Sequence, residues 1–278
     1  MEAQPTIALI GSGVMAEAIF GSLLTQKFTT PEKIRTSDPR LERRLELQNR
    51  YQIQTFAHNE EAVSNADVVV LSVKPQRLQI VLKGLSGKIP PHALVLSIVA
   101  GASITTISTG LRHPAVIRSM PNTPAQIGEG ITIWTVSPDV TSEQQEIGRQ
   151  ILQALGQEIF VEEESYLDMA TALSGTGPAY VFLFMEALID SGVHMGFPRY
   201  IAEQLVVQTL KGSIEYFKQN KAHPATLRNQ VTSPGGTSAA ALYYLEKAGF
   251  RTAISRAVWA AYERAQQLGR DQNSSVPD

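Results

Sequence analysis

Cysteine is absent from this chain of 278 residues. Without a thiol, disulfide bonds, cysteine-ligated metal sites and thiolate catalysis are excluded. The chain has only five histidines, and none has a carboxylate or hydroxyl partner at a suggestive spacing. We therefore expect each histidine to be a surface or packing residue, we expect no metal site, and we assign no general acid.

An excess of charge is also missing, since 24 basic and 26 acidic side chains leave a formal net charge of −2. This balance gives no reason to expect a nucleic-acid partner or an anionic membrane surface. The first six residues lack the basic segment and apolar core of a signal peptide. The apolar runs, such as residues 68–71, are too short to span a bilayer. We therefore expect a soluble, cytoplasmic protein, long enough for two domains.

The first half of the chain alternates short apolar runs with helical stretches. The runs predict buried strands over residues 7–10, 34–36, 68–73, 94–98, 116–119 and 132–136, with a last one at 158–161. Helical patterns cover residues 16–24, 40–50 and 142–155. This alternation predicts an α/β fold with a parallel, Rossmann-like sheet and helices on its faces.

From about Tyr166 the strand signals stop. Helical periodicity predicts helices over residues 178–191, 198–218, 239–247 and 253–268. Each has more apolar surface than one face needs, so we expect burial on several sides and a stable dimer built from this all-α half. We divide the chain into a dinucleotide-binding domain at 1–164, a helical domain at 165–270 and a disordered tail at 271–278.

A glycine turn follows the first predicted strand. Gly11 permits the tight turn, Gly13 lets the backbone approach a pyrophosphate, and Ala16 allows close packing of helix on strand. The start of the next helix offers free N–H groups to the phosphates. We therefore predict dinucleotide binding by Gly11, Ser12, Gly13, Val14 and Met15; the alternative is a glycine turn without a ligand.

The end of the second predicted strand bears on the choice between NADH and NADPH. Ser37 and Asp38 stand there, and an acid in this place favours the ribose hydroxyls of NAD. Arg40, Arg43 and Arg44 follow and favour the extra phosphate of NADP, although Arg43 and Arg44 are equally explained as a solvated helix face. We predict NADPH as the cofactor with NADH possible, and the sequence leaves the preference open.

Three later strand ends are expected at the same edge of the sheet. The first carries Ser72, Val73, Lys74 and Pro75, where the proline stops the strand and holds the lysine near the cofactor. The others carry Ala100, which precedes a glycine, and the rigid loop at residues 120–124, where Asn122 and Thr123 face the nicotinamide.

Two segments of the helical half combine small residues with hydroxyls. In residues 173–180, small residues precede Pro178, which suits the first turn of the following helix. Residues 231–240 carry Ser233, Gly235, Gly236, Thr237 and Ser238 at another helix start, where a carboxylate would be bound well. The alternative is that both segments are helix connections with N-cap hydroxyls.

Together these motifs resemble pyrroline-5-carboxylate reductase. The resemblance covers nearly the whole chain, and its motifs occur in that family's order at residues 11–16, 72–75, 118–124, 173–180 and 233–238, followed by 241–242 and 245–246. It implies a Rossmann-like domain and a helical domain that interleaves with a twin in a dimer, with larger rings of dimers in some members.

The resemblance also implies roles for single residues. Asn59, Ser72, Lys74 and Ala100 would line the cofactor site. Glu164, residue 230 and the loop Gly236, Thr237 and Ser238 would approach the substrate or cofactor at the dimer interface. The chain departs from the family at Ser238, where threonine is usual, and at Gln230, where some members have asparagine.

The implied reaction is NAD(P)H-dependent reduction of 1-pyrroline-5-carboxylate to L-proline, the last step of proline biosynthesis. Hydride would pass from nicotinamide C4 to the C=N carbon, with the protein aligning the two rings. Ser238 and Thr237 are the predicted catalytic residues: Ser238 would bond the ring nitrogen, while backbone N–H groups of residues 235–238 hold the carboxylate.

Two other functions remain to be distinguished. A β-hydroxyacid dehydrogenase shares the two-domain plan but depends on a lysine in the first long helix of its second domain, and residues 178–191 contain none. A non-catalytic dinucleotide sensor would keep the glycine turn without the polar loops at 174–178 and 233–238.

Overall fold

The computed structural model describes residues 4–273, with side chains described as far as residue 270. The chain divides into two compact units, of which one combines Met1–Thr176 with Ala260–Asp278 and the other is Gly177–Trp259. The predicted domain boundary after residue 164 stays a prediction. Helix α12 continues to Asn273, and the rest of the predicted disordered tail lies outside the described residues.

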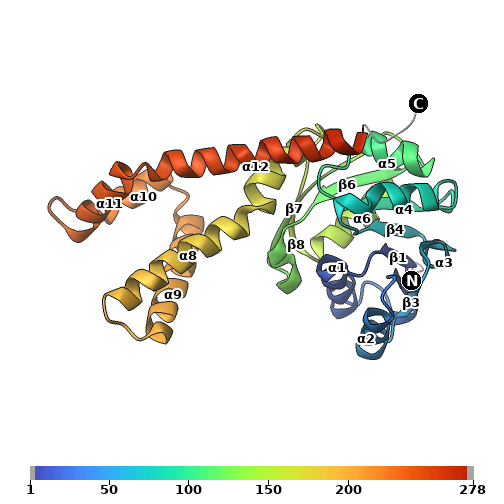
Figure 1. Ribbon diagram of the computed structural model, residues 1–278, viewed down its shortest axis with the longest axis horizontal. Coiled ribbons are helices and arrows are strands. Elements are labelled where there is room, and N and C mark those ends of the chain that lie inside the picture. The colour runs from blue at the N-terminus through green and yellow to red at the C-terminus, as the bar shows by residue number, and fades with distance from the viewer. Residues whose placement is uncertain (1–3, 274–278) are drawn as a thin grey trace. The chain divides into compact units, whose positions relative to one another are not determined.

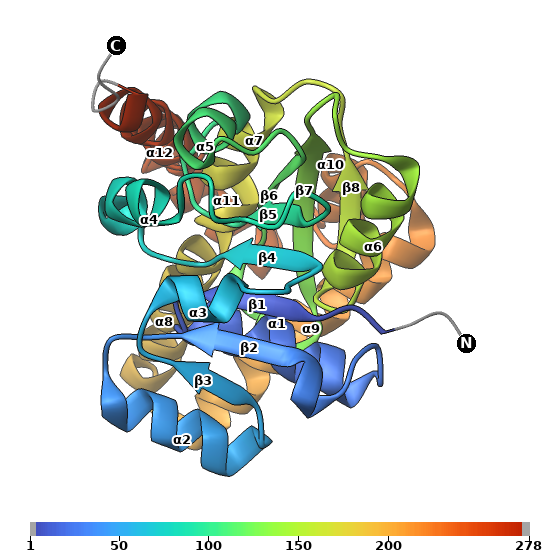
Figure 2. The same cartoon turned by 90° about the vertical axis from the view of Figure 1, so that its right-hand side faces the viewer.

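The first unit contains one eight-stranded sheet, in the order β3-β2-β1-β4-β5-β6-β7-β8 (Figure 2). Its strands are β1 (Ile7–Ile10), β2 (Ile34–Ser37), β3 (Gln54–Phe56), β4 (Val68–Leu71), β5 (Leu94–Ser97), β6 (Val116–Met120), β7 (Gly130–Val136) and β8 (Gly156–Phe160). All neighbouring strands are parallel except β6 and β7. The carboxyl ends of β1 to β6 therefore share one edge, and the strand order reverses between β1 and β4, where such sheets bind ligands.

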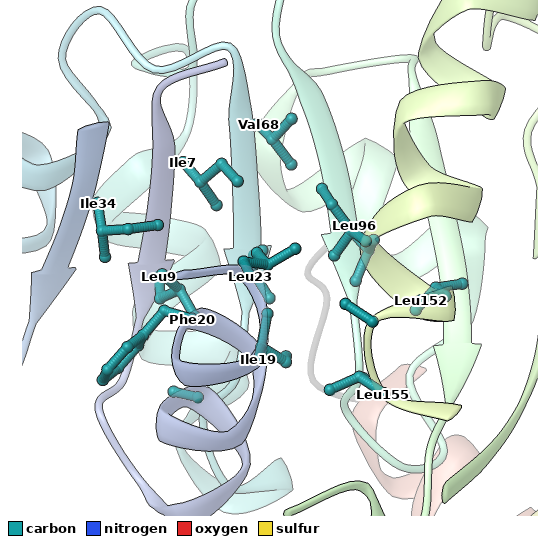
Figure 3. Packing of buried hydrophobic residues seen from close by; sticks show 14 of the residues in the cluster. Ile7, Leu9, Ile19, Phe20, Leu23, Ile34, Val68, Leu96, Leu152 and Leu155 are labelled. Carbon is teal, nitrogen blue, oxygen red and sulfur yellow. The ribbon is translucent and has the colours of Figure 1, made fainter. Parts of the chain in front are cut away.

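Helices cover both faces of this sheet. They are α1 (Val14–Thr25), α2 (Leu41–Tyr51), α3 (Asn59–Val63), α4 (Leu78–Leu85), α5 (Ile104–Leu111), α6 (Ser142–Gln153) and α7 (Tyr166–Ala170). Alternation along β1 sends Ile7 and Leu9 into a core with α1 and α6, shown in Figure 3, and Ala8 and Ile10 into a second core with α3, α4 and α5. The sheet is thus buried on both sides, as its continuous apolar runs require.

The second unit is helical, with α8 (Gly177–His194), α9 (Arg199–Asn220), α10 (Pro224–Gln230), α11 (Thr237–Lys247) and the first part of α12 (Phe250–Asn273). Helices α8 and α9 lie side by side (Figure 1) and meet where Gly192 faces Ala202. Those two are the only buried residues between 177 and 259, all of which the structure describes. The surplus apolar surface expected from the sequence therefore stays exposed in the single chain.

The expectation about apolar runs needs a correction. Among the described residues, the helical stretch Tyr166–His194 is long and apolar enough to cross a membrane by length and composition alone, and 6% of its most apolar window is buried within the chain. Single polar residues interrupt this stretch in the sequence, so no uninterrupted apolar run reveals its full length.

The segment at residues 173–180 is also different from the predicted loop. Thr171–Gly175 forms a π-helical turn that joins α7 to α8. The Thr176 amide donates to the Thr171 carbonyl oxygen at 2.9 Å, and the Thr176 hydroxyl bonds to the same oxygen at 2.8 Å. Small residues and hydroxyls here serve a widened helical turn, a feature common at functional sites.

Candidate active site

The glycine turn lies at the carboxyl end of β1, where the strand order reverses. Gly11 has φ +91°, and a Cβ on it would lie 2.9 Å from Val73 Cγ1 and 3.1 Å from the Ser72 carbonyl oxygen, so only glycine fits. Gly13 is the N-cap of α1, so no side chain caps the start of this helix. No atom lies within 4 Å of the position that a Cβ on Gly13 would take. Open space above an uncapped helix start fits a pyrophosphate group.

Ser12 and the carboxyl end of β2 are joined by a buried hydrogen bond. The Ser12 hydroxyl donates to Asp38 Oδ2 at 2.8 Å, and the Arg40 guanidinium donates to both Asp38 oxygens at 3.0 Å. Burial raises the pKa of Asp38, but the bonds from Arg40 and Ser12 outweigh it and lower the pKa to about 2. Asp38 is therefore a charged, fully engaged carboxylate.

The neighbouring residues around β2 are also arranged in pairs. Ser37 donates its hydroxyl to Asn59 Oδ1 at 2.7 Å, which leaves the amide nitrogen of Asn59 as its donor group. Arg43, in contrast, is bound by the carboxylates of Glu17 at 2.5 Å and Glu46 at 2.9 Å. Ser37 and Asn59 are therefore hydrogen-bonded neighbours at the end of β2. The charge of Arg43 is neutralised by Glu17 and Glu46.

The carboxyl end of β4 contacts the glycine turn. The Ser72 hydroxyl donates to the carbonyl oxygens of Ile10 at 3.0 Å and Gly11 at 2.8 Å, and so stabilises the backbone of the glycine turn. Lys74 is exposed and precedes the short 3-10 turn Pro75–Arg77. These residues lie at the predicted edge, and Ser72 bonds to the protein backbone there.

Two further strand ends close the edge. Gly101 follows Ala100 after β5, with φ +75°, and the C-terminal end of α12 packs on it at Gly269. After β6, Asn122 Oδ1 accepts from the Ile131 amide at 3.0 Å. The Asn122 side chain therefore anchors the loop to the start of β7, which sequence reasoning did not anticipate.

A buried cation that the sequence analysis missed organises Glu164. Arg118 in β6 has a side chain only 6% exposed, and it binds Glu164 Oε1 at 2.8 Å and Asp168 Oδ1 at 2.6 Å. Glu164 Oε1 also accepts from the Ile104 amide at the start of α5, at 2.8 Å. The sequence signal for this cluster is an arginine in a predicted buried strand, because a buried guanidinium requires an acidic partner.

The second candidate loop lies at the start of α11, in the second unit. Gly235 has φ +71°, and Gly236 is the N-cap of the helix without a side-chain cap bond. A Cβ on Gly236 would lie 2.6 Å from Ser233 Oγ. Thr237 and Ser238 are the first two helical residues, so neither hydroxyl is an N-cap, and the alternative of a capping serine does not hold for Ser238.

No group of three or more histidine, aspartate or glutamate side chains in the described part of the chain is placed to hold a metal ion. Among the histidines, His113 is buried and its Nε2 bonds to the Ala93 carbonyl oxygen at 2.7 Å. Burial lowers the pKa of His113. It is a packing residue, as expected.

Comparison with known proteins gives the family. Residues 164–268 match the model of the pyrroline-5-carboxylate reductase dimerisation domain, and residues 6–101 match that of the coenzyme F420-dependent NADP oxidoreductases. The pyrroline-5-carboxylate reductase of Synechocystis sp. is 45% identical over 95% of this chain and 98% of its own length. The chain belongs to the pyrroline-5-carboxylate reductase family.

Two other relatives extend the match. The enzyme of that name from Pseudomonas aeruginosa is 39% identical over 96% of this chain and 99% of its own length. A crystal structure of Plasmodium falciparum pyrroline carboxylate reductase with NADP bound superposes with a TM-score of 0.88 at 31% identity, covering 95% of this chain and 98% of the other. Neither a β-hydroxyacid dehydrogenase nor a non-catalytic sensor is favoured by these matches.

Proposed function

We propose that this protein catalyses the NAD(P)H-dependent reduction of 1-pyrroline-5-carboxylate to L-proline. The observation that carries the proposal is the fit between the glycine turn and a dinucleotide, in a chain that matches a relative of the same family over 95% of its length. Gly13 leaves open space at the uncapped start of α1, and NADP is bound in the Plasmodium relative. The proposed cofactor is NADPH, with NADH as a possible substitute.

The first unit would hold the cofactor through residues at the carboxyl edge of the sheet. Backbone N–H groups at residues 13–15 would receive the pyrophosphate, because the helix start leaves them without intrahelical partners. When bound, NAD(P)H supplies the hydride for the C=N carbon of the substrate, whose ring nitrogen carries a proton as an iminium and becomes the amine of the product. The other proposed contacts are Gly11, Ser12, Ser37, Asn59, Ser72, Val73, Lys74, Pro75, Ala100 and Asn122. Asp38 belongs to the wall of the same site, where its carboxylate is bound by Ser12 and Arg40.

The loop before α11 would hold the substrate. Its carboxylate suits the uncapped N–H groups that follow Gly236, and the Ser238 hydroxyl would bond the ring nitrogen. Two anchors on a small ring determine which carbon can receive the hydride. Ser233, Gly235 and Thr237 complete this proposed subsite, while Glu164 is proposed as a further substrate contact.

Self-association through the helical unit is part of the proposal. Residues 164–268 match a dimerisation domain, and large apolar side chains such as Phe182, Leu183 and Tyr244 are more than 60% exposed in the single chain. Large apolar side chains exposed in this number on one unit indicate an interaction surface. We propose a homodimer that can assemble into larger rings of dimers. A second copy of the chain, and not a bilayer, would then cover the apolar stretch Tyr166–His194. We also propose a cytoplasmic location and no nucleic-acid or membrane partner.

Spectrophotometry tests the function directly. The purified protein should oxidise NADPH, and more slowly NADH, when the cyclic imine is added. The matched control replaces the imine by a β-hydroxyacid with oxidised cofactor, and no reduction is expected. Turnover of the hydroxyacid alone would assign a dehydrogenase, and turnover of neither would leave a binding protein. Sedimentation at micromolar concentration tests the dimer, which a single 30.3 kDa species would contradict.

A further inference from the structure

The acidic residue at the carboxyl end of β2 has no acceptor site left for a ligand. Asp38 Oδ1 accepts from the backbone amide of Arg40 at 2.9 Å and from its Nε at 3.0 Å. Asp38 Oδ2 accepts from Ser12 at 2.8 Å and from the second guanidinium nitrogen at 3.0 Å. A carboxylate has about four lone-pair positions, and four donors occupy them. Asp38 is therefore unsuited to receive the ribose hydroxyls of NAD, which is the role an acid has at this place.

The same contacts hold Arg40 in one orientation. Its side chain is 67% exposed, whereas that of Asp38 is 7% exposed. The buried Asp38 carboxylate thus binds one edge of the Arg40 guanidinium. Two of the five N–H donors of the guanidinium are used in this way, so the outer edge of the planar group is directed to solvent with donors in a fixed geometry. A guanidinium held like this is suited to bind a phosphate with two parallel hydrogen bonds.

The surroundings of Arg40 add positive potential. Arg40 is the N-cap of α2 and has no side-chain bond to the helix, so the positive end of the α2 dipole lies beside it. Arg44, one turn further on, donates to the carbonyl oxygens of Asp38 at 2.8 Å and Pro39 at 3.1 Å, which holds its charge next to the same turn. Arg43 adds nothing here, because Glu17 and Glu46 bind it.

We propose that Arg40, oriented by Asp38, binds the 2′-phosphate of NADPH, and that Asp38 is a positioning residue instead of a ribose acceptor. The proposal deepens the proposed function and rests on it, because it takes the glycine turn as the cofactor site. It reverses the effect that an acid at this place has on cofactor choice: the pair Asp38 and Arg40 would favour NADPH.

Calorimetric titration of the full chain with adenosine 2′,5′-bisphosphate and with AMP tests this without turnover. The two probes differ only by the 2′-phosphate. Arg40→Gln should weaken bisphosphate binding by about 10- to 100-fold, the size of a lost hydrogen-bonded charge pair, and leave AMP binding unchanged. Arg40→Lys keeps the charge without the planar fork and should give an intermediate loss. Arg50→Gln is the matched control, since Arg50 is an exposed arginine at the other end of α2, and it should change neither affinity.

Asp38→Asn tests the positioning role. It should lower bisphosphate affinity several-fold and leave AMP affinity unchanged, and it should cause no further loss in the Arg40→Gln background, because both changes remove one interaction. A rise in bisphosphate affinity, or an equal loss of affinity for the bisphosphate and for AMP, would show that Asp38 does not orient Arg40 toward the 2′-phosphate and would overturn the proposal. Unchanged bisphosphate affinity in Arg40→Gln would also overturn it.

Turnover separates this inference from the function on which it rests. If the wild type binds the bisphosphate through Arg40 but does not oxidise NADPH with the cyclic imine, the proposed reaction fails and the phosphate site stands. If the imine is reduced normally and the bisphosphate does not depend on Arg40, the phosphate site fails alone.

Discussion

Gly101 and Gly269 face each other so closely that neither tolerates a side chain. A Cβ on Gly269 would lie 2.9 Å from the Gly101 carbonyl oxygen, and a Cβ on Gly101 would lie 3.0 Å from the Gly269 amide nitrogen. This contact joins the C-terminal end of α12 to the loop after β5, and α12 reaches the side of α5 in Figure 1 and Figure 2. The last turns of the chain thus support a loop of the proposed cofactor site.

Gly269→Ala should therefore destabilise the protein, although alanine is the better helix former. The close contact involves backbone on both sides, so the elements must separate, at a cost of about 1 to 3 kcal/mol. Gly84→Ala in α4 is the matched control: its Cβ meets nothing within 4 Å, and the change should raise stability by about 0.5 to 1 kcal/mol. Urea denaturation of both variants measures this, and equal shifts in the two would show that the contact between Gly101 and Gly269 can relax freely.

Gly13→Val should abolish binding of the dinucleotide and leave the fold intact. The added side chain meets no protein atom within 4 Å, and it would fill the space that the pyrophosphate needs. Gly11→Val is the informative contrast, because it clashes with Val73 and forces a strained φ, so it should lose stability as well. Fluorescence titration with NADPH and thermal melting compare the two. Ordinary NADPH affinity in Gly13→Val would place the cofactor elsewhere.

Arg118→Met should cost about 3 kcal/mol of stability. The substitution keeps the volume of the side chain but leaves Glu164 and Asp168 as neighbouring carboxylates without their shared cation. The control is Arg199→Gln, which removes an exposed pair with Asp190 and should cost at most about 1 kcal/mol. Chemical denaturation at neutral pH measures both losses. If Arg118→Met were no worse than the surface variant, the buried cluster would be dispensable for the fold.

Stability should fall as the solution becomes acidic, with a contribution from His113. Burial lowers the pKa of His113 below its ordinary 6.5, so the unfolded chain binds a proton at a pH where the folded chain does not. This contribution is complete above pH 6.5 and is lost as the pH falls from there towards the folded pKa. His113→Gln should flatten the dependence of the unfolding free energy on pH in that window. An identical slope in both proteins would mean that other groups cause it.

Much of the fold could be predicted because it depends on local patterns. The apolar runs located β1 and β4 within two residues, and Gly11 and Gly13 located the turn between β1 and α1. Strand β3 is missing from the prediction because Gln54–Phe56 is a short, partly exposed edge strand without an apolar run. The predicted loop at residues 173–180 overlaps the end of the π-helical turn Thr171–Gly175, because glycine and hydroxyl residues are common in loops and in such a turn.

The candidate site was harder to predict, because side-chain pairing is not local. Asp38 and Arg40 could be named from the sequence, but not that they bind each other and Ser12. Arg118 and Glu164 are 46 residues apart, and their contact depends on how β6 packs against the segment before α7. Tertiary contacts decide which arginine keeps N–H donors exposed to solvent, as Arg40 does, and which is enclosed by carboxylates, as Arg43 is, so spacing alone left the cofactor open.

Ser238 provides the sharpest test of the proposed chemistry. The Ser238→Ala variant should lower kcat/KM for the cyclic imine by about one to two orders of magnitude, since a hydrogen bond to a charged group contributes about 1.5 to 3 kcal/mol. Ser238→Thr restores the hydroxyl found in the family and should retain most activity. NADPH affinity should be unchanged in both, because the cofactor is assigned to the other unit.

Stability distinguishes this role from a structural one. Gly236 is the N-cap of α11, so the Ser238 hydroxyl caps no helix and its loss should leave the melting temperature unchanged. A hydroxyl that stabilised the helix start would instead cost about 1 kcal/mol when removed and leave turnover nearly normal. Melting curves and steady-state kinetics on the same two variants decide the matter. A destabilised Ser238→Ala enzyme with normal kcat/KM would show that Ser238 does not contact the substrate. If its hydroxyl positions the ring nitrogen, removing the hydroxyl must lower the rate of hydride transfer.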